Sequence, residues 1–159
     1  MLNHFWLYAC KILLFQYIGV SVKKVITFGT FDMLHIGHVN ILNRAASIGD
    51  YLIVGVSSDE LNLRKKERRS IYNQDDRMAI VSSLKGVSEV FLEESLEKKL
   101  EYIREKDATI LVMGDDWFGK FDWVRSHCEV IYLPRTPLIS TTEVICKVRT
   151  PDSINTECE

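Results

Sequence analysis

The ten-residue segment GTFDMLHIGH, residues 29–38, constrains the fold of this chain most. It follows an apolar run, residues 25–28, that predicts a buried strand, and it precedes residues 38–48, whose apolar side chains recur at helical spacing. A strand therefore passes into a helix N-terminus, where free N–H groups and the helix dipole favour an anion. Gly37 lets the backbone approach a ligand closely, and His35 and His38 share one face of the helix. The segment predicts a phosphate site.

Strand-like and helix-like runs alternate along the rest of the chain. Strands that are apolar throughout and alternate with helices predict an α/β fold, with a parallel five-stranded sheet and helices on both faces. The predicted strands are Val25–Phe28, Tyr51–Val56, Glu89–Phe91, Thr109–Met113 and Val130–Leu133. The predicted helices are His38–Ile48, Asn73–Ser83, Leu96–Lys106, Lys120–His127 and Thr141–Val148. Ligands of such sheets bind beyond the carboxyl ends of the strands.

A second phosphate-binding segment is predicted at residues 135–142, RTPLISTT. Ser140 or Thr141 can cap the last predicted helix, where hydroxyl and N–H groups can hold a phosphate. Arg135 adds a charged fork that matches phosphate oxygens. The alternative interpretation is an ordinary helix cap after a proline turn.

Both segments resemble signatures of the cytidylyltransferases, a family of the HxGH nucleotidyltransferase superfamily. The first resembles GTFDxxHxGH and the second RTxGISTT, and the resemblance extends over roughly residues 22–148. It implies a single Rossmann-like domain over residues 22–150 that binds CTP. The family's glycine in the second signature is Leu138 here. If this position needs a positive φ, leucine is costly there.

A third segment narrows the expected substrate. MGDDWFGKFD, residues 113–122, resembles the MGDDWxGKFD stretch of the family's glycerol-3-phosphate members. This resemblance implies transfer of CMP from CTP to glycerol 3-phosphate, giving CDP-glycerol and pyrophosphate. Two alternatives stay open: a cytidylyl- or adenylyltransferase for another phosphorylated alcohol (ethanolamine, choline or sugar phosphate), and a non-catalytic nucleotide-binding module.

The resemblance also implies which residues form the site. The expected catalytic residues are His35, His38, Lys65 and Arg135. The expected nucleotide-binding residues are Gly29, Thr30, Phe31, His35, Gly37, His38, Arg68, Asp116, Arg135, Thr136, Ile139, Ser140 and Thr141. The expected acceptor-binding residues are Lys65, Arg77 and Lys99. The resemblance further implies Mg²⁺ bound mainly through the CTP phosphates, no metal site built from side chains, and a homodimer. The basic run at residues 64–69 is predicted to be a loop beside the site.

Composition and the chain ends limit the remaining functions. A net charge of −2 over 159 residues argues against a general nucleic-acid or membrane-surface role. Residues 1–21 are apolar, but Lys11 interrupts them and no cleavage site follows, so neither a secure span nor a signal peptide is predicted. We expect the native chain to start at position 22; the alternative for residues 1–21 is an amphipathic membrane anchor. Residues 151–159 form a polar tail. The four scattered cysteines predict reduced thiols and a cytoplasmic protein, where CTP is available.

Overall fold

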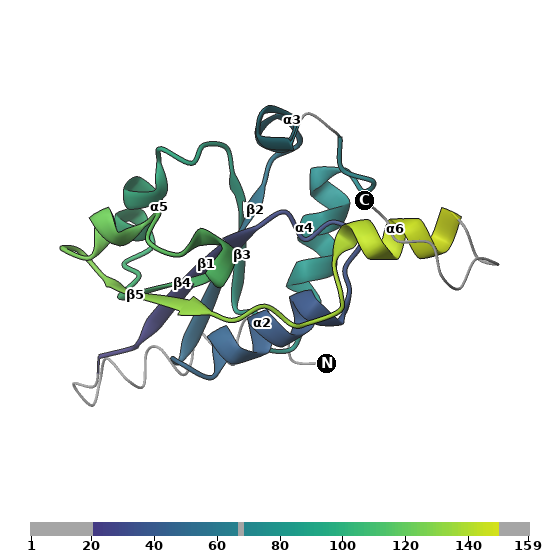
Figure 1. Ribbon diagram of the computed structural model, residues 1–159. Helices are drawn as coiled ribbons and strands as arrows, with labels where there is room; N and C mark the ends of the chain where they lie inside the picture. Colours follow the sequence, from purple (N-terminus) through teal and green to yellow (C-terminus); the bar gives the residue numbers. More distant parts are fainter. Residues whose placement is uncertain (1–20, 67–68, 150–159) are drawn as a thin grey trace.

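A computed structural model describes residues 21–66 and 69–149 (Figure 1). Its five strands form one parallel sheet in the order β3-β2-β1-β4-β5. The strands are β1 (Lys24–Gly29), β2 (Tyr51–Ser57), β3 (Glu89–Glu93), β4 (Ile110–Gly114) and β5 (Glu129–Leu133). The predicted α/β fold and its five strands are confirmed. Predictions for the N-terminal extension, the tail and Arg68 lie outside the described residues.

Helices cover both faces of the sheet, as the apolar strands predict. Ile26 packs in a cluster with Tyr102, whereas its neighbour Val25 packs on the other face with Leu42 and Val81. Burial on both faces explains why the strands lack an alternating polar pattern. The helices are α2 (Ile36–Ala46), α3 (Asp59–Lys66), α4 (Gln74–Ser82), α5 (Lys99–Glu105) and α6 (Thr141–Arg149), with short 3₁₀ turns η1 (Asp115–Trp117) and η2 (Asp122–Val124).

Two predictions from the sequence, one of a helix and one of a loop, are wrong. The predicted helix Lys120–His127 contains only η2, in which Val124 N–H and Arg125 N–H bond to carbonyls three residues back. The basic run predicted as a loop begins inside α3, which the sequence analysis missed. This helix starts just after Ser58, whose hydroxyl accepts Leu61 N–H at 3.0 Å. The sequence analysis missed it because most of its side chains are charged, so few apolar residues recur at helical spacing.

Smaller differences concern a helix start and a cysteine. Helix α5 begins at Lys99 rather than Leu96. Cys128 is a free, buried thiol as predicted, but Cys146 is disulfide-bonded, so the prediction of thiols is wrong there. Within residues 21–66 and 69–149, none of the helices has the length and apolarity needed to cross a membrane.

The topology fixes where a ligand can bind. The strand order reverses beside β1, because β2 lies on one side of it and β4 on the other. In open parallel sheets such a reversal leaves a crevice at the carboxyl ends of the strands. Gly29, Ser57 and Gly114 end β1, β2 and β4 at this edge.

Candidate functional site

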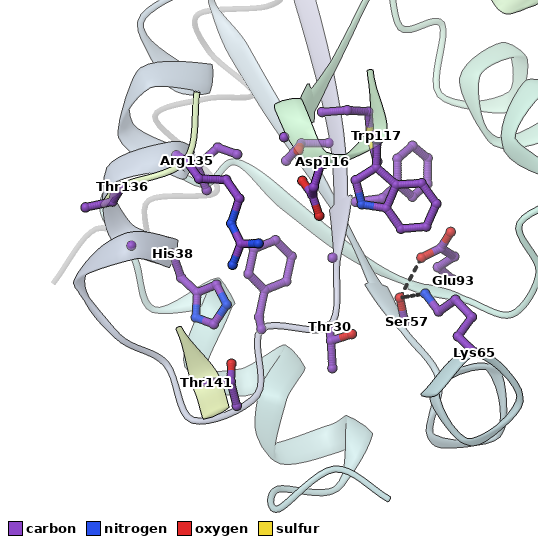
Figure 2. Close-up of a pocket in the computed structure, with 18 of the residues that line it drawn as sticks. Thr30, His38, Ser57, Lys65, Glu93, Asp116, Trp117, Arg135, Thr136 and Thr141 are labelled. Carbon is purple, nitrogen blue, oxygen red and sulfur yellow. Dashed lines mark hydrogen bonds between the residues drawn. The ribbon is translucent and has the colours of Figure 1, made fainter. Parts of the chain in front are cut away.

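A cavity of about 410 Å³ lies at this edge, and most of the predicted site residues line it (Figure 2). His38 and Arg135 lie toward one end and Lys65 and Ser57 toward the other, with Asp116 between them. The predicted residues in the lining are Gly29, Thr30, Phe31, His35, Gly37, His38, Lys65, Lys99, Asp116, Arg135, Thr136, Ile139 and Thr141. Segments far apart in the sequence therefore meet in one cavity.

The two histidines are fixed by the start of α2. His35 is the N-cap residue, and its Nδ1 accepts Gly37 N–H at 3.1 Å. His38 Nδ1 accepts His35 N–H at 3.4 Å, and the two rings stack with centroids 3.9 Å apart. Because each Nδ1 is an acceptor, the neutral imidazole carries its proton on Nε2. The first signature thus builds a stacked pair of N–H donors.

The charge state of His35 follows from its surroundings. Burial lowers the pKa of His35 below the usual 6.5, and the positive charge of Arg135 lowers it further. His35 is therefore neutral at pH 7 and acts as a hydrogen-bond donor rather than a fixed cation. Arg135, which also lines the cavity, supplies the permanent charge of this end.

The second signature is held by capping contacts. Ser140 Oγ accepts Glu143 N–H at 3.2 Å, so Ser140 caps α6 as predicted, but it is not among the residues that line the cavity. Thr141 Oγ1 donates to the Asp32 carbonyl at 3.2 Å, and Thr136 Oγ1 accepts from Asn40 at 3.3 Å. These contacts tie the second signature to the first and to α2.

Asp32 anchors the site, and the sequence analysis did not assign it a role. Its carboxylate accepts the N–H groups of Ile71 at 2.8 Å and Tyr72 at 3.0 Å. The residues on either side, Phe31 (φ +53°) and Met33 (φ +46°), adopt the left-handed conformation. Non-glycine residues in this conformation mark a segment that its surroundings force into shape, as is common at functional sites. Asp32 is part of the first signature, and this was the sequence signal from which its role could have been predicted.

Arg77 supports the cavity from behind. It is fully buried and does not belong to the cavity lining. Its guanidinium donates to the carbonyls of Thr30 at 2.7 Å and Ser57 at 2.8 Å, and it pairs with Asp59 at 2.6 Å. Arg77 therefore joins the ends of β1 and β2 to α3. The structure places the predicted acceptor ligand as a support of the loops that line the cavity.

The far end of the cavity is basic. Lys99 is buried against Glu93 and the ring of Phe28, and Lys65 Nζ donates to Ser57 Oγ at 3.0 Å. Burial lowers the pKa of Lys99 from 10.5 to about 8, although Glu93 opposes the shift. Both predicted lysines line the cavity. The sequence analysis missed Glu93 and Ser57, which have no distinguishing local pattern.

Leu138 stands at a position that suits glycine. Its φ is +58°, and its side chain is 91% exposed, so no packing offsets the strain. We expect Leu138→Gly to raise the free energy of unfolding by about 0.5–1 kcal/mol, since the left-handed conformation costs a non-glycine residue about 1–2 kcal/mol and glycine loses part of that gain in the unfolded chain. Urea denaturation measures the change. Leu138→Ala is the control, and equal stability of the two variants would contradict backbone strain.

Comparisons with known proteins agree with this site. The sequence pattern described as cytidylyltransferase-like matches residues 26–147. Glycerol-3-phosphate cytidylyltransferases of Bacillus spizizenii, Bacillus subtilis and Staphylococcus aureus are 50%, 47% and 44% identical to the chain over 123 residues. These matches cover 77% of this chain and 95%, 95% and 92% of the respective relatives.

A solved structure supports the fold independently. A lipopolysaccharide core biosynthesis protein from Thermoplasma volcanium superposes with a TM-score of 0.65 at 24% identity, covering 73% of this chain and 99% of that one. At this identity the likeness concerns the fold alone. The matched pattern and the three relatives identify the family, and the geometry of the cavity agrees with them. The chain belongs to the cytidylyltransferase-like family.

Proposed function

We propose that the protein transfers CMP from CTP to glycerol 3-phosphate, giving CDP-glycerol and pyrophosphate. One observation carries this proposal: a single cavity is lined by His35, His38 and Arg135 at one end and by the basic residues Lys65 and Lys99 at the other. Two anionic substrates need two such ends. The three relatives that share 44–50% of the aligned residues carry the name of this activity.

The proposed reaction uses both ends of the cavity. An oxygen of the acceptor phosphate attacks the α-phosphorus of CTP in line, and the bond from the α-phosphorus to the bridging oxygen of pyrophosphate breaks. The acceptor is already anionic near neutral pH, so catalysis consists of positioning and charge stabilisation. The Nε2–H groups of His35 and His38 donate to phosphate oxygens as charge develops. Arg135 holds the leaving pyrophosphate, and Lys65 holds the acceptor.

Mg²⁺ is the expected cofactor. Among residues 21–66 and 69–149, no three His, Cys, Asp or Glu side chains gather into a metal site. Mg²⁺ is usually held by nucleotide phosphates and water with few protein ligands. When bound, the ion neutralises part of the triphosphate charge. Asp116, one of two carboxylates in the lining, can accept hydrogen bonds from the nucleotide or from water on such an ion. The homodimer and the cytoplasmic location stay predictions.

A panel of acceptors tests the substrate. We expect the highest kcat/KM with CTP and glycerol 3-phosphate, measured as pyrophosphate release, because both lysines at the acceptor end favour an anion and disfavour a cationic group. Choline phosphate and ethanolamine phosphate, which carry an ammonium group besides the phosphate, serve as comparisons, and ATP replaces CTP as the base control. A higher kcat/KM with choline phosphate or ethanolamine phosphate would contradict glycerol 3-phosphate as the acceptor, while leaving the reaction class intact. Nucleotide binding without turnover of any acceptor would support the non-catalytic alternative.

A further inference from the structure

Four side chains at the basic end of the cavity form a continuous series of contacts, and Figure 2 labels three of them, Lys65, Ser57 and Glu93. Lys65 Nζ donates to Ser57 Oγ at 3.0 Å, and Ser57 Oγ donates to Glu93 Oε2 at 2.7 Å. The other oxygen of Glu93 binds Lys99 Nζ. The four residues come from α3, β2, β3 and α5. One carboxylate thus connects two lysines that are far apart in the sequence.

Burial makes the Glu93 carboxylate important as the charge partner of Lys99. Glu93 and Lys99 are each 1% exposed and Ser57 is 0% exposed, yet all line the cavity. A buried ammonium group without a partner is costly, and Glu93 supplies the opposite charge. Lys99 Nζ also lies 3.4 Å from the centroid of the Phe28 ring, which adds a cation–π contact on another side. The position of the Lys99 ammonium is therefore fixed by protein groups before any ligand binds.

The charge at this end is positive overall. Lys65 and Lys99 bring two ammonium groups and Glu93 a single carboxylate. The carboxylate is already engaged on both oxygens, by Ser57 and by Lys99. An anionic acceptor group that enters the cavity meets lysines whose positions Glu93 controls.

We propose that Glu93 is a positioning residue for the acceptor phosphate, because it holds Lys99 directly and Lys65 through Ser57 with both ammonium groups at the cavity. The proposal rests on the proposed function for the identity of the acceptor. Glu93 acts through the lysines and does not itself contact the substrate. Its removal affects acceptor binding and leaves CTP binding at the histidine end unchanged.

The pH dependence of acceptor binding distinguishes positioning from mere structural support. The charged groups that act on Lys99 are Glu93 and Lys65, while the rings of Phe28 and Phe121 that face it are neutral. Burial lowers the pKa of Lys99 to about 8, and both the charge and the hydrogen bond of Glu93 raise it. Without Glu93 the pKa falls further, so Lys99 loses its proton at a lower pH. The alkaline decline of kcat/KM then moves to lower pH.

The experiment compares Glu93→Gln with Glu89→Gln. Glu89 lies on the same strand and pairs with Lys106 at 2.9 Å, but it does not line the cavity. For Glu93→Gln we expect the KM for glycerol 3-phosphate to rise about tenfold or more, the scale of one lost charge-assisted hydrogen bond, while the KM for CTP stays within about twofold. The alkaline decline moves by about one pH unit or more. Glu89→Gln changes neither quantity.

A second variant, Ser57→Ala, keeps the inference testable. Ser57→Ala retains every charge and the contact between Glu93 and Lys99, but it removes both contacts of the hydroxyl, the one from Lys65 and the one to Glu93. We therefore expect it to raise the KM for glycerol 3-phosphate and to move the alkaline decline less than Glu93→Gln does. If Glu93→Gln does not fold, this variant decides, and an unchanged KM overturns the inference. An equal rise of both KM values in Glu93→Gln, or a pH profile that matches Glu89→Gln, also overturns it.

Different results would contradict the proposed function and the positioning role of Glu93. If the wild-type protein makes no CDP-glycerol, the proposed function is wrong. NMR titration of ¹³C-labelled lysine side chains then tests Glu93 without turnover, because the Lys99 signal must titrate at a lower pH in Glu93→Gln than in the wild type. Identical titration midpoints overturn the role of Glu93.

Discussion

Replacing His38 with alanine is expected to lower kcat about 10²–10³-fold, the scale for the loss of one donor to a transition-state oxygen. His35→Ala has the same expected effect on turnover, and it also removes the N-cap of α2, which costs about 1 kcal/mol of stability. Steady-state kinetics with CTP and glycerol 3-phosphate measures both losses, and circular dichroism verifies that the variants are folded.

The control for the histidines is His127→Ala. His127 is exposed, contacts Arg104 and does not line the cavity, so its loss leaves turnover unchanged. Near-normal kcat in both His35→Ala and His38→Ala would contradict the assignment of the stacked pair as phosphate donors. A loss confined to KM would assign them to ground-state binding instead.

The largest stability effect is expected at Arg77. Arg77→Met removes the guanidinium that donates to the carbonyls of Thr30 and Ser57 and pairs with Asp59. The side chain of Asp59 is 45% exposed, so the cost comes mainly from the lost hydrogen bonds of the buried guanidinium. Each buried polar group left unsatisfied costs about 1–3 kcal/mol, and we expect a loss of about 2–4 kcal/mol in the free energy of unfolding measured with urea.

Arg125→Met is the matched control for that substitution. Arg125 pairs with Asp122 at 3.1 Å, but both side chains are about half exposed, so its loss costs about 0–1 kcal/mol. If Arg77→Met were no more destabilising than Arg125→Met, the buried guanidinium would not hold the strand ends together. Full stability with weakened acceptor binding would instead restore the predicted role of Arg77 as an acceptor ligand.

The fold was predictable because its strands carry their own signal. Val25 and Ile26 pack on opposite faces of the sheet and both are apolar, which is the pattern of a buried parallel strand. The histidine segment was predictable for a related reason. The strand, the turn and the helix start are adjacent in sequence, so one short segment contains the whole local geometry.

The missed parts depend on contacts between distant segments. Lys99 was predicted, but its partner Glu93 was missed, because Glu93 stands in a stretch crowded with glutamates and only the tertiary structure selects it for burial against Lys99. The resemblance to the family implied that Arg77 binds the acceptor, but the structure buries it behind the cavity. Its partners Thr30, Ser57 and Asp59 come from separate elements, which no local pattern indicates.

The central claim is that the acceptor phosphate attacks the α-phosphorus of CTP in this cavity. ³¹P NMR of a reaction with CTP and glycerol 3-phosphate, labelled with ¹⁸O in its phosphate, tests it most directly. The account predicts CDP-glycerol with ¹⁸O in the oxygen that bridges the two phosphorus atoms, and unlabelled pyrophosphate in equal amount. Formation of CMP and pyrophosphate alone, or of CDP-glycerol with an unlabelled bridge, would contradict it.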